Sequence, residues 1–161
     1  MNEDKFGMDQ ESHRKIASAL FNHTWDLMEK TRTPYEDEIM ISEAQASLFH
    51  WRYAGGNLEF SRGHWIISRV YSILSMPESA IYHGRRCLEF CKIGNLNDFD
   101  FGFAYEALAR AYYIEGDFNE FEKNFRIAKE FAKKIKSTDD RKWLETNLNS
   151  ISENKGDKHD V

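Results

Sequence analysis

The sequence predicts an all-α fold in which antiparallel helix pairs stack on one another. Three observations support this prediction. Apolar residues recur at spacings of three and four over most of the chain, as in amphipathic helices. Gly, Asn and Pro interrupt that pattern at intervals that leave about seven helices of ordinary length. No segment alternates apolar and polar residues as a half-buried strand would.

The first two predicted helices span residues 11–30 and 34–54, and both have an apolar stripe. The second begins at Thr33-Pro34-Tyr35-Glu36. In this run the Thr can cap the helix, the Pro suits the first helical position and the Glu completes a capping box. Gly55-Gly56 then ends the helix.

Asn57 is expected to cap the third helix, which reaches Leu74 and contains Gly63. A Gly inside a helix costs about 1 kcal/mol relative to Ala. We therefore expect a neighbouring helix to approach closely at Gly63. The run Ser75-Met76-Pro77-Glu78 predicts a second capping box, which opens a fourth helix that ends at Gly94.

The fifth helix is expected to start at Asn97 or Asp98. Gly116 suits the left-handed residue just past its end. Asp117 then forms a capping pair for the sixth helix with the Glu three residues later. A seventh helix is expected over residues 139–151.

Residues 102–135 place a set of packing and turn residues in one register: Tyr105, Leu108, Ala109, Tyr112, Gly116, Phe118, Phe125 and Ala128. In this register the stretch resembles a tetratricopeptide repeat, a helix–turn–helix unit of about 34 residues. Phe121 is larger than the family's residue at its position, and the closing Pro is absent. A weaker copy over residues 61–94 aligns Tyr71 with Tyr112.

The resemblance implies a short α-solenoid of three helix pairs, in which the first pair is degenerate. The seventh helix is then the C-terminal cap, because the last pair of a stack has an apolar face without a successor. The predicted organisation is a flexible N-terminus over residues 1–10, a single domain over 11–153 and a disordered tail over 154–161.

In tetratricopeptide proteins the first helix of each pair lines a concave groove, so the resemblance also implies ligand-binding positions. Carried onto this chain they are Arg62, Trp65, Arg69, Phe103, Glu106, Arg110 and Tyr113. The three guanidiniums suit an anionic group such as a carboxylate, and the aromatic rings provide rigid contact area. In the structural alternative, Arg69 and Glu106 pair across adjacent helices.

Net charge and hydropathy argue against nucleic acids and anionic membranes as partners and against a membrane-spanning or secreted protein. The chain carries a net charge of -5 with cations and anions interleaved, whereas nucleic-acid and anionic-membrane binders need a basic excess. No apolar run approaches the ~20 residues of a membrane span, and the polar N-terminus lacks a signal-peptide core. We therefore expect a cytoplasmic protein. Cys87 and Cys91 are expected to be buried packing residues.

No catalytic residue, metal ligand or cofactor is expected from the motifs present. His50, His64 and His83 lack the Glu-x-x-His or His-x-x-x-His spacing of helical metal sites. Trp25 and Trp143 are expected to serve packing, as is Trp51. The predicted function is a protein- or peptide-binding module whose partner carries an anionic group. The alternatives are a small-molecule sensor or enzyme in a helical bundle, and an assembly subunit that binds a second copy.

Overall fold

The structure is a computed structural model that describes residues 4–153. Seven helices occupy this part of the chain: α1 Gln10–Met28, α2 Pro34–Ala54, α3 Asn57–Ile73, α4 Pro77–Ile93, α5 Asp98–Glu115, α6 Phe118–Lys134 and α7 Thr138–Glu153. Within it no residue lies in a strand, and the predicted all-α fold is confirmed. The predicted tail over 154–161 lies outside the described residues, as do the first three residues of the predicted flexible N-terminus.

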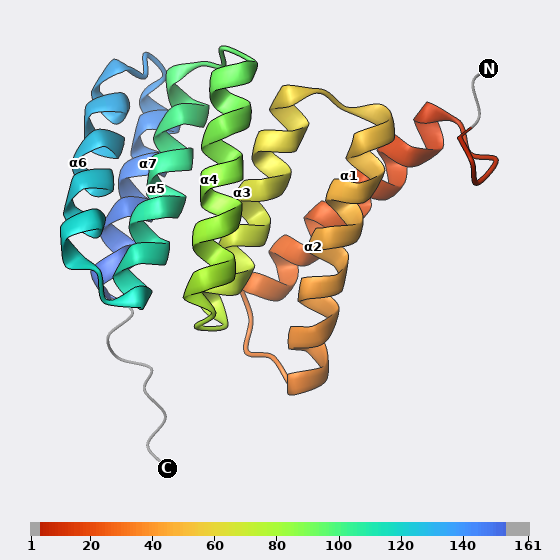
Figure 1. The fold of residues 1–161 in the computed structure, drawn as a ribbon, viewed down its shortest axis with the longest axis horizontal. Helices are drawn as coiled ribbons and strands as arrows, with labels where there is room; N and C mark the ends of the chain where they lie inside the picture. The colour runs from red at the N-terminus through yellow and green to blue at the C-terminus, as the bar shows by residue number, and fades with distance from the viewer. Residues whose placement is uncertain (1–3, 154–161) are drawn as a thin grey trace.

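Successive helices pair and then stack into a solenoid-like array (Figure 1). The pairs are α1 with α2, α3 with α4 and α5 with α6, and they join where α2 packs on α3 and α4 packs on α5. Further contacts connect α1 to α3, α3 to α5 and α5 to α7. Helices α1, α3, α5 and α7 therefore form one layer, which we call the inner layer.

Local chemistry sets most of the helix ends as predicted. Thr33 and Glu36 form the reciprocal capping box of α2. The side chain of Asn97 accepts the first hydrogen bond of α5, and that of Asp117 does the same for α6. Gly116 adopts φ +87°, the left-handed conformation expected of a helix C-terminus, where a side chain would strain the backbone.

Two helix starts differ from the prediction. Ser75 does not cap α4, because it lies in the left-handed region at φ 55° and completes the end of α3 instead. Met76 is the capping residue and makes no side-chain hydrogen bond. Asn57 is already inside α3, so Gly56 takes the capping position, and its amide donates to the Glu59 carboxylate at 2.8 Å.

The core follows the predicted repeat positions. Leu108 and Tyr112 are buried, as predicted. The predicted close approach at Gly63 is also confirmed, because a Cβ atom there would lie 2.9 Å from Leu48 Cδ1 of α2. The two cysteines are buried free thiols.

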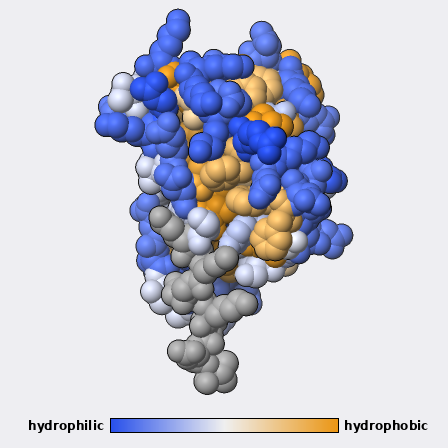
Figure 2. Space-filling model, turned by 90° about the vertical axis from the view of Figure 1, so that its left-hand side faces the viewer, coloured by the Kyte–Doolittle hydropathy of each residue, from blue (hydrophilic) through white to orange (hydrophobic). Residues whose placement is uncertain are grey.

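Helix α7 occupies the position of the predicted cap, against α5 and α6. Its side chains Leu144 and Leu148 are buried. A Cβ atom at Gly102 of α5 would lie 2.4 Å from Leu144 Cδ2, so the glycine permits this close approach. Figure 2 shows apolar surface in the middle of this end of the array, framed by hydrophilic side chains.

Candidate functional site

An open pocket of about 170 Å³ lies in the inner layer. Its lining is mostly aromatic, and the rings come from α1, α3, α5 and α7: Phe21, Trp25, Trp65, Phe99, Phe103 and Trp143. Arg62, Asp100, Ser61 and Cys87 supply the polar atoms. This pocket is the candidate site.

The aromatic rings contact one another across the helices. Trp25 of α1 stacks on Trp65 of α3 with their ring centroids 5.6 Å apart. Trp65 in turn meets Phe103 of α5 edge-on at 5.7 Å, and Trp143 of α7 lies 6.0 Å from Trp25. Aromatic pairs at such distances attract one another. The pocket is therefore lined by rings that support each other's positions.

An ion pair contributes the charged groups of the pocket. Arg62 of α3 donates from Nε to Asp100 Oδ1 at 2.9 Å, and more weakly from Nη2 to Oδ2 at 3.5 Å. Asp100 lies in the first turn of α5, where a carboxylate is favoured, and its side chain is 3% exposed. The Arg62 side chain is 49% exposed, and among the described residues its Nη1 has no hydrogen-bond partner. Within this pair, the charge that solvent can reach is therefore the positive one.

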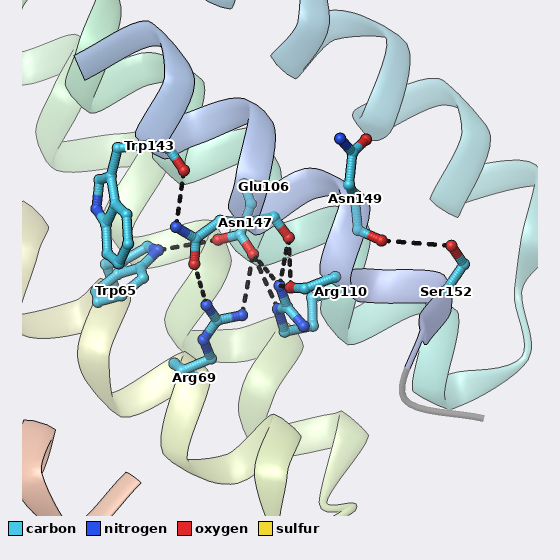
Figure 3. Close-up of polar contacts among 9 residues, drawn as sticks. Trp65, Arg69, Glu106, Arg110, Trp143, Asn147, Asn149 and Ser152 are labelled. Atoms are coloured by element: carbon cyan, nitrogen blue, oxygen red, sulfur yellow. Dashed lines mark hydrogen bonds and ion pairs between the residues drawn. The ribbon is translucent and has the colours of Figure 1, made fainter. Parts of the chain in front are cut away.

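A buried polar cluster, which we call the Glu106 network, adjoins the pocket (Figure 3). Glu106 Oε1 accepts hydrogen bonds from Arg69 Nη1 at 3.2 Å and from Arg110 Nε at 2.8 Å. Its Oε2 accepts one from the indole Nε1 of Trp65 at 3.1 Å. The network therefore fixes the position of the pocket-lining Trp65 through its indole N–H.

The same arginines bind α7. Arg110 Nη2 donates to the backbone oxygen of Asn147 at 2.8 Å and to Ser150 Oγ at 2.9 Å. Arg69 Nη2 donates to Asn147 Oδ1, and Asn147 Nδ2 donates to the backbone oxygen of Trp143 at 2.9 Å. The network thus connects α3, α5 and α7 at one point.

Burial and ion pairing act in opposite directions on the groups of this network. Burial raises the pKa of Glu106, but the guanidiniums of Arg110 and Arg69 together bring it below its ordinary value. Burial lowers the pKa of Arg69 to about 10, while Glu106 partly opposes the shift. Glu106 and Arg69 are therefore both charged at neutral pH.

Glu29 adds an exposed carboxylate at the pocket, since it accepts a hydrogen bond from Nε1 of the pocket-lining Trp25 at 3.0 Å. Arg62, Arg69 and Arg110 are therefore matched by the carboxylates of Asp100, Glu106 and Glu29.

The predicted ligand-binding residues divide into three places. Arg62, Trp65 and Phe103 line the pocket. Arg69, Glu106 and Arg110 meet in the Glu106 network, where the pairing of the structural alternative is present. Tyr113 packs edge-on against Phe118 and Phe121, with centroid distances of 5.7 and 5.1 Å, and does not line the pocket. A ligand-binding role for these residues remains a prediction.

Sequence reasoning missed several lining residues: Phe21, Trp25, Phe99, Asp100 and Trp143. Trp25 and Trp143 were expected to serve packing alone, yet both line the pocket, and Trp143 is 45% exposed. The sequence predicts groove positions only for its two aligned repeats. The first pair has no recognisable motif, so the four-residue spacing of Phe21 and Trp25 was the available signal on α1.

Histidines form two contacts that the sequence spacing did not predict. His13 Nδ1 lies 2.8 Å from His50 Nδ1, and His64 Nδ1 lies 2.9 Å from His83 Nδ1. Burial lowers the pKa of His64 to about 3 and that of His83 to about 4. Over residues 4–153, no group of three or more His, Cys, Asp or Glu side chains is arranged to hold a metal ion.

Two buried thiols contact the pocket-lining Ser61, and Cys87 lines the pocket itself. Ser61 Oγ is 3.4 Å from Cys87 Sγ and 3.1 Å from Cys91 Sγ. Burial raises the pKa of Cys87, which is the thiol that lines the pocket. A protonated thiol is a poor nucleophile, so the environment of Cys87 favours packing over covalent chemistry. The hydrogen bond with Cys87 lowers the pKa of Cys91, which does not line the pocket.

Comparison with known proteins found no match, so the site is interpreted from its own geometry. The helices in the described part of the chain are all too short or too polar to cross a membrane. The observations that bear on function are therefore the pocket, the Arg62–Asp100 pair and the Glu106 network. No protein-family model, curated protein or solved structure matches this chain.

Proposed function

We propose that the protein is a tetratricopeptide-like binding module that holds a partner protein or peptide on its inner layer. The observation that carries this proposal is the open pocket lined by six aromatic rings. Aromatic side chains are enriched at the centres of protein interfaces, where they supply large contact areas at low cost in conformational entropy. A partner that fills the pocket would remove the exposed indole of Trp143 from water.

The size of the pocket favours one anchoring side chain. Its volume is about 170 Å³, and an apolar cavity of about 150 Å³ admits one benzene molecule. Sites that enclose a whole drug-sized ligand or cofactor measure roughly 300–1,000 Å³. The pocket is therefore better suited to a single side chain of a larger partner than to a complete cofactor, which favours a binding module over a sensor or an enzyme.

The helical-repeat interpretation supports the same function. The repeat register over residues 102–135 agrees with the observed α5–α6 pair, and its packing residues Leu108 and Tyr112 are buried. Among the three predicted groove arginines, Arg69 and Arg110 are paired within the Glu106 network. Arg62 is therefore the member of that set that can receive an anionic group from a partner.

A peptide library tests this proposal. Peptides displayed on phage are selected on the full chain, and their affinities are measured for the wild type, for Phe99→Ala/Trp143→Ala and for Tyr82→Ala. Tyr82 is an exposed aromatic residue of α4 that does not line the pocket. We expect the selected peptides to lose about tenfold or more in affinity for the pocket variant and to bind Tyr82→Ala as they bind the wild type. Peptides that bind the pocket variant and the wild type equally would contradict the proposal.

A further inference from the structure

We infer that the pocket takes an aromatic side chain flanked by a carboxylate, presented by a partner peptide. This inference rests on the proposed function and specifies its ligand. Two independent features of the site support it: the size and lining of the cavity, and the exposed donor edge of the Arg62 guanidinium.

The cavity selects the ring. Its volume of about 170 Å³ holds one aromatic side chain. The rings that surround it already meet edge-on and in tilted pairs, as Trp65 does with Phe103 and Phe99 does with Phe103. A further ring can join such a cluster through the same edge-to-face contacts, which an aliphatic side chain cannot make.

Arg62 selects the carboxylate. Asp100 occupies the Nε and Nη2 edge of the guanidinium, so the opposite edge, formed by Nη1 and the second N–H of Nη2, remains for a ligand. Asp100 is almost fully covered, whereas half of the Arg62 side chain is exposed. A carboxylate next to the ring would therefore meet an exposed, positively charged donor.

The same geometry disfavours a cationic ligand. Aromatic cages attract ammonium groups, and an aromatic pocket alone would permit that alternative. Here the Arg62 guanidinium already lies 5.8 Å from the centre of the Phe99 ring. An ammonium group in the pocket would be repelled by this guanidinium and would find Asp100 already paired.

Defined peptides and the four indole N–H signals test the inference. The probes are acetylated, amidated tripeptides with the sequences Glu-Phe-Glu, Gln-Phe-Gln, Glu-Ala-Glu and Lys-Phe-Lys, titrated into the ¹⁵N-labelled full chain. Trp25, Trp65 and Trp143 line the pocket, whereas Trp51 does not and serves as an internal control. The indole signals are assigned with single Trp→Phe variants.

We expect Glu-Phe-Glu to shift the three pocket indoles and to leave Trp51 unchanged. It should bind about five- to tenfold more tightly than Gln-Phe-Gln, as one exposed charge-assisted contact would give. Arg62→Gln should abolish this difference, so that Glu-Phe-Glu and Gln-Phe-Gln bind the variant with equal affinity. Arg126→Gln, an exposed position on α6 outside the pocket, should preserve the difference.

Arg62→Lys protects the test against misfolding, because it keeps a cation beside the buried Asp100. It should retain part of the preference for Glu-Phe-Glu, since a lysine cannot present a second donor edge. Tighter binding of Lys-Phe-Lys, or equal shifts with Glu-Ala-Glu, would overturn the inference. If the phage-selected peptides shift the pocket indoles and Glu-Phe-Glu does not, the ligand class is wrong while the binding function stands.

Discussion

Replacing Glu106 with Gln removes the carboxylate that Arg69 and Arg110 share. The Glu106 side chain is 1% exposed, and those of its partners are 13% and 8% exposed. Gln is nearly the same size as Glu but has one acceptor oxygen. If that oxygen accepts from Trp65, the amide NH2 faces the two guanidinium donors that Glu106 now binds. The substitution therefore changes the charge of the network with little change in its shape.

The magnitude follows from the burial of the two guanidiniums. A guanidinium stays protonated in proteins at neutral pH, so Arg69 keeps its charge when Glu106, which opposes the lowering of its pKa in the wild type, is replaced. The variant therefore holds two buried cations without a counter-charge, and removing one partner of a buried ion pair costs about 3–5 kcal/mol. For a domain of about 150 residues, each kcal/mol shifts Tm by about 2–4 °C. We expect Tm to fall by roughly 6–20 °C.

Urea denaturation at pH 7 measures the loss of unfolding free energy, with far-ultraviolet circular dichroism and tryptophan fluorescence as probes, and a thermal melt measures the fall in Tm. The matched control is Glu130→Gln, which removes an exposed carboxylate paired with Lys133 at 2.8 Å. Exposed pairs of this kind contribute about 0–1 kcal/mol.

Glu106→Gln should therefore unfold at a clearly lower urea midpoint than Glu130→Gln, while the slope of unfolding free energy against urea concentration stays the same for both. A Glu106→Gln variant that unfolds at the same midpoint as Glu130→Gln would refute the reasoning. It would mean that water reaches the two guanidiniums and screens them from one another.

Three further predictions concern the core, the cap and the histidines. Leu108→Ala should cost about 2–5 kcal/mol of unfolding free energy. Adding Gly84→Ala to this variant should recover part of the loss in thermal melts, because the new Cβ would fill space beside the position of Leu108 Cδ2, 3.0 Å away in the wild type. A chain ending at residue 136 should associate in light scattering, because loss of α7 exposes apolar surface of α5 and α6; a stable monomer would contradict the cap. The free energy of unfolding should be at its full value above pH 6.5 and fall towards pH 3–4, because the unfolded chain takes up protons that the folded His64–His83 pair does not. Each histidine should contribute at most about 1.4 kcal/mol per pH unit to this fall. The variant His64→Leu/His83→Leu should make the urea midpoint depend less on pH over this range, and an unchanged pH dependence would contradict the lowered pKa values of the pair.

The helices could be predicted because their signals are local. The Thr33 capping box and the left-handed Gly116 depend on residues within a few positions of one another, and both formed as expected. The predicted cap at Ser75 was wrong because a second local requirement acts on the same residue. The same residue was needed to end α3, and a residue in the left-handed region cannot also hold the extended conformation of a capping residue.

The sequence by itself determined the all-α class, the order of the helices and the burial of repeat positions such as Leu108, since periodic apolar spacing requires each helix to bury one face. Tertiary structure alone decided the partners of the arginines and the presence of the pocket. Arg69 and Asn147 are 78 positions apart and meet only because α7 packs against α5 beside α3. The pocket depends in the same way on Trp25, Trp65 and Trp143 approaching from three helices, and the rotation of each helix about its axis is set by its neighbours.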